Sequence, residues 1–91
     1  MLPKNRPPSH PGEILLHEFL APLGMTQSAL ATDLDIPIQR VNTIVQGRRA
    51  VTPDTALKFA RRFKTSAEFW MNLQTKHDLW KAEHHTRPRS H

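Results

Sequence analysis

TQSALATDLDIPIQRVNTIVQGRR, residues 26–49, is the part of this 91-residue chain that decides its fold. In its first half, Leu30, Ala31 and Leu34 recur at the spacing that places apolar side chains on one face of a helix. Thr26 can cap that helix, because a threonine hydroxyl accepts a hydrogen bond from a backbone N–H of the first turn. Ala31 is small, as the close approach of another helix requires. The first half is therefore predicted to be a short helix that packs against a neighbour.

A tight turn and a second helix are predicted to come next. Asp35 stands where the turn needs a left-handed backbone, which aspartate tolerates better than most residues do. Pro37 suits the first position of the second helix, and Gly47 suits the position that ends it. The buried face of this helix is predicted to consist of Val41, Ile44 and Val45. Two helices joined in this way have the layout of a helix-turn-helix unit, whose second helix lies in the major groove of DNA.

The outward side chains of the second helix are of types that read base edges. Amides pair with adenine, guanidinium groups with guanine, and methyl groups contact thymine. The predicted base-contacting residues are Ile38, Gln39, Arg40, Asn42 and Thr43. Phosphate contacts are predicted at the start of the first helix and just after the second, at Gln27, Ser28, Arg48 and Arg49. The alternative is an ordinary helical hairpin in a small bundle, in which Ser28 faces solvent.

The net charge of +5 is distributed unevenly along the chain. Residues 10–35 hold four acidic and no basic side chains, whereas residues 36–64 hold seven Lys and Arg against Asp54 alone. Positive charge is thus concentrated on the predicted second helix and on the segment after it, as in a protein that binds a polyanion. A solvated basic helix face is the plainer explanation, but it does not account for the coincidence of the charge with the motif.

The segment ahead of the motif predicts one further helix. It starts near Pro11, with His10 or Ser9 as its cap. It should end at Ala21, because Pro22 disfavours helical geometry in the residue before it. Its apolar stripe is predicted to consist of Ile14, Leu15, Phe19 and Leu20.

Two helices are predicted after the motif. One starts at residues 52–54, where a threonine cap, a proline and an aspartate stand in succession. The other starts at residues 65–68, whose order Thr-Ser-Ala-Glu is that of a capping box. The apolar face of the first of these is predicted to consist of Ala56, Leu57, Phe59, Ala60 and Phe63. No strand pattern appears, so the predicted fold class is all-α, a bundle of five helices. Its predicted parts are a flexible arm at residues 1–9, a DNA-binding domain at residues 10–83 and a polar tail at residues 84–91.

The last predicted helix carries bulky side chains at helical spacing. They are Phe69, Trp70, Leu73, His77 and Trp80. Core packing is the default interpretation, but Trp80 lies about 15 Å along the helix axis from Trp70 and would reach past the bundle. An exposed tryptophan there favours a partner surface. These residues are therefore candidates for a dimer or partner interface, and core packing stays open for both tryptophans. A dimer is expected also because two related helices double the contact with DNA.

Other classes of protein find little support in the sequence. There is no cysteine, so there is no disulfide framework and no thiolate metal site. His17 comes four residues after Glu13, but no second ligand pair has a useful spacing, so neither a metal nor a cofactor is expected. No phosphate-binding loop or nucleophile elbow appears, and an enzyme is not expected. The absence of a membrane-length apolar run and of a signal peptide favours a cytoplasmic protein.

Two blocks around the motif resemble the HigA-type antitoxins, which belong to the Xre, lambda-repressor-like class of helix-turn-helix proteins. The blocks are SHPGEILLHEFLAPLGMT, residues 9–26, and TPDTALKFARRFKTSAEFWMNLQTKHDLW, residues 52–80. The resemblance extends from residue 9 to about residue 83. The opening His10–Glu13 and the block Glu68–Gln74 are specific to this group.

The resemblance implies a homodimer that binds a palindrome in its own promoter. It also implies binding and neutralisation of a HigB-type toxin, a RelE-like ribonuclease that cleaves mRNA on the ribosome. The family pattern places base contacts on the second helix of the motif and phosphate contacts at Gln27, Arg48 and Arg49. Asp35 replaces the glycine that the family usually has in the turn. Two alternatives stay open: a free-standing regulator without a toxin, and a toxin-binding protein that does not bind DNA.

Overall fold

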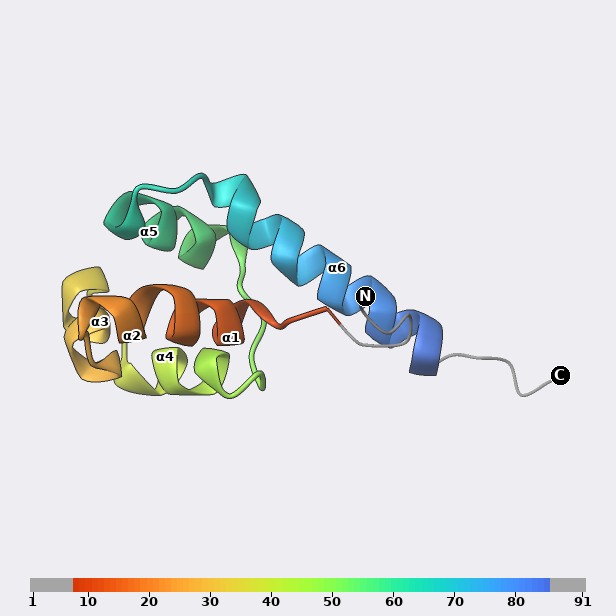
Figure 1. Ribbon diagram of the computed structural model, residues 1–91, viewed down its shortest axis with the longest axis horizontal. Coiled ribbons are helices and arrows are strands. Elements are labelled where there is room, and N and C mark those ends of the chain that lie inside the picture. The colour runs from red at the N-terminus through yellow and green to blue at the C-terminus, as the bar shows by residue number, and fades with distance from the viewer. Residues whose placement is uncertain (1–7, 86–91) are drawn as a thin grey trace, which may run out of the picture.

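The structure, a computed structural model, describes residues 8–85 and consists of helices joined by short loops (Figure 1). The first helix is continuous and has three parts: α1 (Pro11–Ile14), η1 (Leu15–Leu20) and α2 (Ala21–Leu23). After it come α3 (Gln27–Leu34), α4 (Ile38–Val45), α5 (Pro53–Phe63) and α6 (Ala67–His85). Residues 8–85 contain no strand, so the prediction of an all-α fold with five helices is confirmed. Most of the predicted arm and tail, residues 1–7 and 86–91, lies outside the described residues.

The first helix runs further than predicted, because its central part is π-helical. Ala21, its predicted last residue, has helical φ and ψ of −62° and −49°, and Pro22 lies within the helix. In a π turn each N–H bonds to the carbonyl five residues back, as the Ala21 N–H does to Leu16. This wider turn makes room for a proline ring that would collide with an α-helical turn. The helix ends at Gly24, which has a left-handed φ of 63°.

Side chains cap the starts of the helices, largely as predicted. His10, Thr26 and Thr52 each accept a hydrogen bond from an N–H in the first turn of their helix, at 2.9, 3.0 and 3.5 Å. The predicted capping box at residues 65–68 is wrong. Ser66 caps α6 instead, by accepting from the Phe69 N–H at 3.0 Å.

Apolar side chains from every helix meet in one core. Its buried members are Leu15, Leu20, Leu30, Ala31, Leu34, Val41, Ile44, Val51, Ala56, Phe59 and Trp70. The buried faces predicted for α3 and α4 are confirmed, with Val45 half-buried at the edge. The prediction for Leu57 is wrong, because this side chain is 55% exposed on the outer side of α5. Thr55 takes an inward place on that helix and is buried.

Trp70 is the centre of an aromatic cluster that joins α6 to the rest of the bundle. Its ring centroid lies 4.9 Å from that of Phe59 and 5.1 Å from that of Phe19. The indole N–H donates to the Thr65 hydroxyl at 2.8 Å, so the polar atom of this fully buried side chain is satisfied. The core interpretation of Trp70 is thus confirmed, and its assignment to a partner interface is wrong, because none of its side chain reaches the surface.

The last helix, α6, is the longest and projects beyond the bundle (Figure 1). Its first half is fixed to the body through Gln74, a buried residue whose side-chain oxygen accepts from the Val51 N–H at 2.7 Å. The Gln74 amide group donates in turn to Asp78 at 2.9 Å. The helix continues to His85 and so passes the predicted domain boundary at residue 83. This projection contributes to the elongated shape of the chain, with extents of 48 × 29 × 21 Å.

Candidate nucleic-acid interface

The turn between α3 and α4 has the left-handed residue that the sequence predicts. Asp35 has φ 58° and ψ 49°, and the Ile36 N–H bonds back to the Ala31 carbonyl at 3.1 Å. Aspartate therefore serves in the place of the usual glycine. Pro37 is extended, with ψ 143°, and precedes the first residue of α4 instead of being that residue. The fixed φ of proline suits both positions, and only ψ distinguishes them.

The end of α4 is closed at Gly47, as predicted. Gly47 has φ 76°, and its N–H bonds to the Ile44 carbonyl at 2.9 Å. The Arg48 N–H bonds to the Thr43 carbonyl at 2.9 Å, which completes the pair of bonds of a Schellman motif. This sharp reversal brings Arg48 and Arg49 directly beside the last turn of α4.

The exposed face of α4 brings together the five predicted base-contacting residues. Ile38 and Gln39 are exposed, and the half-buried members are Arg40, Asn42 and Thr43. The opposite face is anchored by Val41 and Ile44, neither of which has any exposed area. The face of α4 is therefore held in place by the core and remains accessible to a ligand.

The Thr43 hydroxyl links α4 to the loop after it. It donates to the Gln39 carbonyl at 2.7 Å and accepts from Arg49 Nε at 3.2 Å. The hydroxyl group is thus occupied within the protein, and the methyl group is the part of this side chain suited to a base contact. Arg49 is at the same time held against α4, while Arg48 contacts the Gln46 side chain at 3.4 Å.

Arg40 is paired with the start of α5. Its Nη1 lies 3.7 Å from Asp54 Oδ2, and the two side chains are 32% and 70% exposed. The sequence pattern does not reveal this pair, because Asp54 is on another helix and its position there indicates only a favourable helix start. The contact places a carboxylate beside the predicted base-reading residues.

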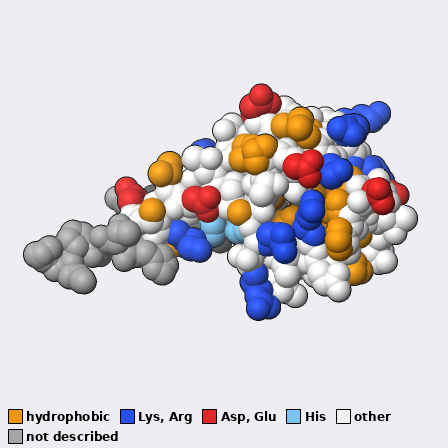
Figure 2. Space-filling view, turned by 180° about the vertical axis from the view of Figure 1, so that it is seen from behind, with side chains coloured by type: hydrophobic (Ala, Val, Ile, Leu, Met, Phe, Trp, Pro, Cys, Tyr) orange, Lys and Arg blue, Asp and Glu red, His pale blue; other side chains and the backbone are white. Residues whose placement is uncertain are grey.

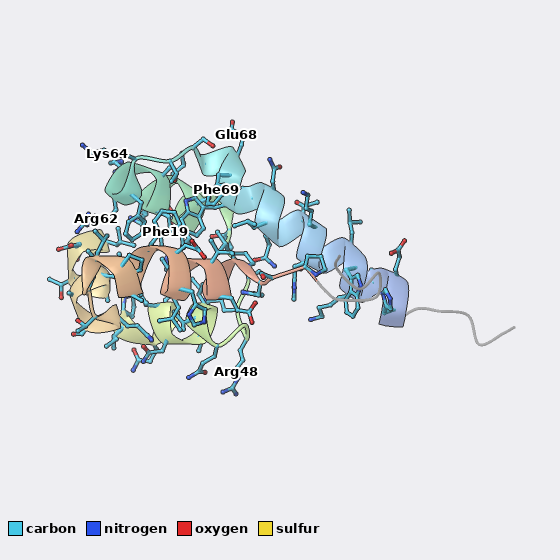
Figure 3. All side chains as sticks on the ribbon, in the orientation of Figure 1. Phe19, Arg48, Arg62, Lys64, Glu68 and Phe69 are labelled. Carbon is cyan, nitrogen blue, oxygen red and sulfur yellow. The ribbon has the colours of Figure 1, made fainter. Side chains whose placement is uncertain are left out.

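Lys and Arg side chains form a band across one face of the molecule (Figure 2). Figure 3 places Arg48 at the lower edge, below α4, whereas Arg62 and Lys64 lie at the far end of α5. Arg62 is paired with Asp33 at 3.1 Å. The positive charge on the C-terminal side of the motif is therefore spread along α5 and does not all lie next to α4.

The predicted phosphate contacts at the start of α3 lie around its Thr26 cap. Gln27 is half-buried in the first turn, and Ser28 is exposed. Ser28, Thr32 and Ile38 line an open hollow between α3 and the start of α4. The structure thus places Ser28 beside the start of α4 and Arg48 and Arg49 beside its end, whereas Gln27 lies in the first turn of α3.

Gly12 has a structural role in this face that sequence reasoning missed. A Cβ atom on Gly12 would collide with the Ile44 carbonyl oxygen and lie 2.7 Å from the Ile44 carbonyl carbon. The backbone of α1 thus touches the backbone of α4, and only glycine permits so close an approach. The block around Gly12 is a family signature in the sequence, but the partner of this glycine is too distant along the chain to be found from spacing.

The outer surface of α6 carries the remaining candidates for a partner interface. Phe69 is 37% exposed and lies near Phe19 at the start of the helix (Figure 3). Leu73 and His77 are half-buried against the chain's own bundle. Trp80 is half-buried and stacks on His84 with ring centroids 3.9 Å apart. Leu79, which was not predicted, is the most exposed of the large apolar residues within residues 8–85, at 62%.

A pair of histidines joins the first helix to α6. The rings of His10 and His77 meet edge to face at 4.9 Å, and His77 Nδ1 lies 3.2 Å from the Pro8 carbonyl oxygen. His10 Nδ1 accepts the capping bond from Gly12, which requires that nitrogen to be unprotonated. Burial and the neighbouring His77 lower the pKa of His10 below its ordinary value, although Asp78 and Glu13 oppose this shift.

The stability of the fold is expected to fall as the pH drops through about 6.5, where an unfolded histidine takes up a proton that His10 in the folded chain resists. The slope contributed by His10 can reach at most about 1.4 kcal/mol per pH unit. Urea unfolding at pH 7.5, 6.5 and 5.5 measures it for the wild type and for His10→Asn, which keeps a capping oxygen but does not titrate. Parallel curves for the two proteins would contradict the assignment.

Neither a metal centre nor a membrane span is found in the part of the chain that the structure describes. Within residues 8–85, no group of three or more His, Cys, Asp or Glu side chains is placed to hold a metal ion. None of the helices in that range is both long and apolar enough to cross a membrane.

The exposed α4, its left-handed turn and the flanking α3 define a helix-turn-helix protein. A helix-turn-helix family profile matches residues 16–70. Virulence-associated protein I of Dichelobacter nodosus is 47% identical over 81 residues, which are 88% of this chain and 75% of that protein. Antitoxin HigA-1 of Vibrio cholerae is 39% identical over 77 residues, which are 85% of this chain and 71% of that protein.

A solved structure of Pseudomonas aeruginosa antitoxin HigA with the higBA promoter is also similar. It has a TM-score of 0.85 and 43% sequence identity, over 87% of this chain and 86% of that one. The chain belongs to the helix-turn-helix family of DNA-binding proteins and, within it, to the HigA-type antitoxins. An HTH-type transcriptional regulator of Haemophilus influenzae is 45% identical over 82 residues, which are 90% of this chain and 77% of that protein. Relatives named as a regulator and as an antitoxin agree with the prediction that the chain is not an enzyme.

Proposed function

We propose that this chain is a repressor and antitoxin that binds an operator palindrome in its own promoter and neutralises a RelE-like, mRNA-cleaving toxin of the HigB type. The observation that carries the DNA-binding part is the α4 face, which is anchored by Val41 and Ile44 and presents amide, guanidinium and methyl groups. The likeness to a HigA antitoxin solved with promoter DNA supports the same interpretation. Both activities belong in the cytoplasm, where the DNA and the ribosomes are.

In this proposal, α4 enters the major groove and its face selects the sequence. The base-contacting residues are Ile38, Gln39, Arg40, Asn42 and Thr43. Phosphates are held by Gln27 and Ser28 on one side of the groove and by Arg48 and Arg49 on the other. Neutralising phosphates releases counterions, so part of the affinity depends on salt and is the same for every sequence.

Arg40→Ala is expected to cost about 1–3 kcal/mol of operator binding and to relax the base preference, because a guanine contact is lost. Arg49→Ala should weaken binding to all sequences alike and reduce the salt slope by about 0.9, because a phosphate contact is lost. Titrations of operator and scrambled duplexes at several salt concentrations separate the two effects. Unchanged affinity in both variants would rule out the α4 face as the DNA-reading surface.

The proposed homodimer would place two α4 helices in half-sites about 34 Å apart, one turn of the double helix. We propose α6 as its interface, because Phe69, Leu79 and Trp80 leave apolar surface on the side of a helix that projects from the bundle. Sedimentation analysis of the wild type and of Leu79→Glu tests this. A wild type that sediments as a monomer at micromolar concentration would contradict the dimer.

The proposed binding of a toxin is tested by a gel shift on the native upstream region. The shift is run with and without a small basic ribonuclease whose gene lies next to that of this chain. Co-purification of the two proteins supports the antitoxin function. If they do not co-purify and the ribonuclease does not alter the gel shift, a free-standing regulator is favoured. Relatives described as HTH-type transcriptional regulators support that second candidate. A blank gel shift combined with toxin binding would favour an antitoxin that does not bind DNA.

A further inference from the structure

Asp54 places a negative charge beside the α4 face, where it would repel the phosphates of bound DNA. It is the only acidic residue in residues 36–64. It lies in the first turn of α5, and its side chain is 70% exposed. Its carboxylate faces Arg40 across a gap of 3.7 Å. A neutral side chain at this position would repel phosphates less. Affinity for DNA therefore does not explain why an aspartate stands here.

The ion pair of Arg40 and Asp54 also contributes little to the stability of the fold. The distance of 3.7 Å lies within the reach of an ion pair but exceeds that of a good hydrogen bond. Ion pairs as exposed as this one contribute little to folding, because solvent screens them and two long side chains must be held in one arrangement. Arg40 can therefore leave Asp54 for another acceptor at little cost.

The effect of Asp54 differs between the two kinds of DNA contact. Attraction to phosphate is charge against charge and is present at every sequence. A guanidinium group reads guanine through hydrogen bonds to N7 and O6, which depend on position and are available only at the right base. A carboxylate near Arg40 weakens the attraction of Arg40 to phosphate, because the two opposite charges cancel at a distance. The N–H groups that bond to guanine stay in place.

We propose that Asp54 is a specificity-determining residue, which lowers the affinity of Arg40 for phosphates in general and so reserves it for a guanine in the operator. The inference rests on the proposed DNA-binding function. Asp54 acts through Arg40 and need not touch DNA. Its removal should therefore raise binding to any sequence more than it raises binding to the operator.

The chain offers a matched control in Asp33. This residue is paired with Arg62 at 3.1 Å, and the two side chains are 44% and 37% exposed. Arg62 lies eight residues after Asp54 on α5, or about 12 Å along the helix axis. That separation exceeds the Debye length of about 8 Å at 0.15 M salt. Asp33→Asn changes the net charge as Asp54→Asn does, but it removes the partner of Arg62 and leaves the pair of Arg40 and Asp54 in place.

The experiment measures binding of the full chain to an operator duplex and to a scrambled duplex of the same length and composition, at about 50, 100 and 200 mM salt, a range over which screening changes markedly. The proteins are wild type, Asp54→Asn, Asp54→Glu and Asp33→Asn. Circular dichroism and thermal unfolding verify that each is folded. Asp54→Ser, which is also neutral and tolerated at a helix start, serves as a second neutral variant.

Asp54→Asn is expected to bind the scrambled duplex more tightly, with a salt slope steeper by about 0.9. Its affinity for that duplex should therefore fall about three- to four-fold more than that of the wild type over a four-fold rise in salt. Its preference for the operator should drop several-fold. Asp54→Glu keeps the charge and should keep the preference, and Asp33→Asn should shift both duplexes alike.

Two results would overturn the inference by different routes. A wild type that binds both duplexes equally contradicts the proposed function and the inference with it. A wild type that prefers the operator, while both neutral variants of Asp54 keep the same preference, contradicts the inference alone. The same holds if Asp33→Asn lowers the preference as much as Asp54→Asn does.

Discussion

Replacing Trp70 by alanine is expected to lower the free energy of unfolding by about 3–5 kcal/mol, the usual range for a large aromatic side chain lost from a core. Trp70 has no exposed area and contacts Phe19 and Phe59 across the bundle. The truncation leaves a cavity among the rings of Phe19, Phe59 and Phe69, which come from three different helices, so a shift of one helix cannot close it. Since domains of this size are stable by about 5–15 kcal/mol, much of the fold's margin depends on this side chain.

Urea unfolding followed by circular dichroism, at equal protein concentrations, measures the loss. Leu57→Ala is the control, because Leu57 is 55% exposed on the outer side of α5, away from the proposed dimer interface, and should cost about 1 kcal/mol or less. Trp70→Phe should fall between the two, because it keeps a ring but leaves the Thr65 hydroxyl without its donor. Equal losses for Trp70→Ala and Leu57→Ala would contradict the central place of Trp70 in the core.

Gly12→Ala is expected to destabilise the fold by about 3 kcal/mol, the upper part of the range for overpacking. The added methyl group would meet the Ile44 carbonyl group and come within 2.9 Å of the Val45 Cα atom. These are backbone atoms, which cannot rotate away as a side chain can. The only relief is separation of α1 from α4, and this displaces the helix whose exposed face we propose reads DNA. Operator binding should therefore fall even under conditions where the variant remains folded.

Gly24→Ala is the control for this substitution. Gly24 is left-handed, with φ 63°, but an added Cβ atom would meet nothing within 4 Å. Alanine there should cost about 1 kcal/mol through backbone strain alone and leave operator binding unchanged. Thermal unfolding and operator titration of both variants separate the two mechanisms. A Gly12→Ala protein with wild-type stability and affinity would contradict the close approach of the helices.

The features of this fold that depend on local sequence could be predicted. Caps at His10, Thr26 and Thr52, the left-handed Asp35 and the glycine stop at residue 47 each depend on chemistry within a few residues. The same holds for most of the buried stripes, which repeat with the helical period, although Leu57 in the predicted stripe of α5 is exposed. The predicted end of the first helix failed because of an exception to such local rules. A proline is tolerated inside the first helix because a π-helical segment precedes it, and the sequence carries no marker for that segment.

The exposed face of α4, which we propose reads base edges, was predictable for the same local reason, but the contacts that hold α4 in place were not. The contact of Gly12 with α4 joins residues that are far apart in the chain, and so does the pair of Arg40 and Asp54. Spacing rules describe one helix at a time and do not say which residue of another helix stands opposite. The place of Trp70 likewise depended on where the bundle ends along α6, which only the packed structure establishes.

The loop between α4 and α5 is held at both ends before any ligand arrives. At one end the Schellman motif fixes Gly47 and Arg48, and at the other Gln74 holds the Val51 amide. The span in between is too short to sample many arrangements. A flexible loop would lose conformational entropy on binding a phosphate. In this loop most of that entropy is already lost when the chain folds. We therefore expect the backbone of this loop to hold its arginines in place before a phosphate binds, and a change at Gln74 to loosen that arrangement.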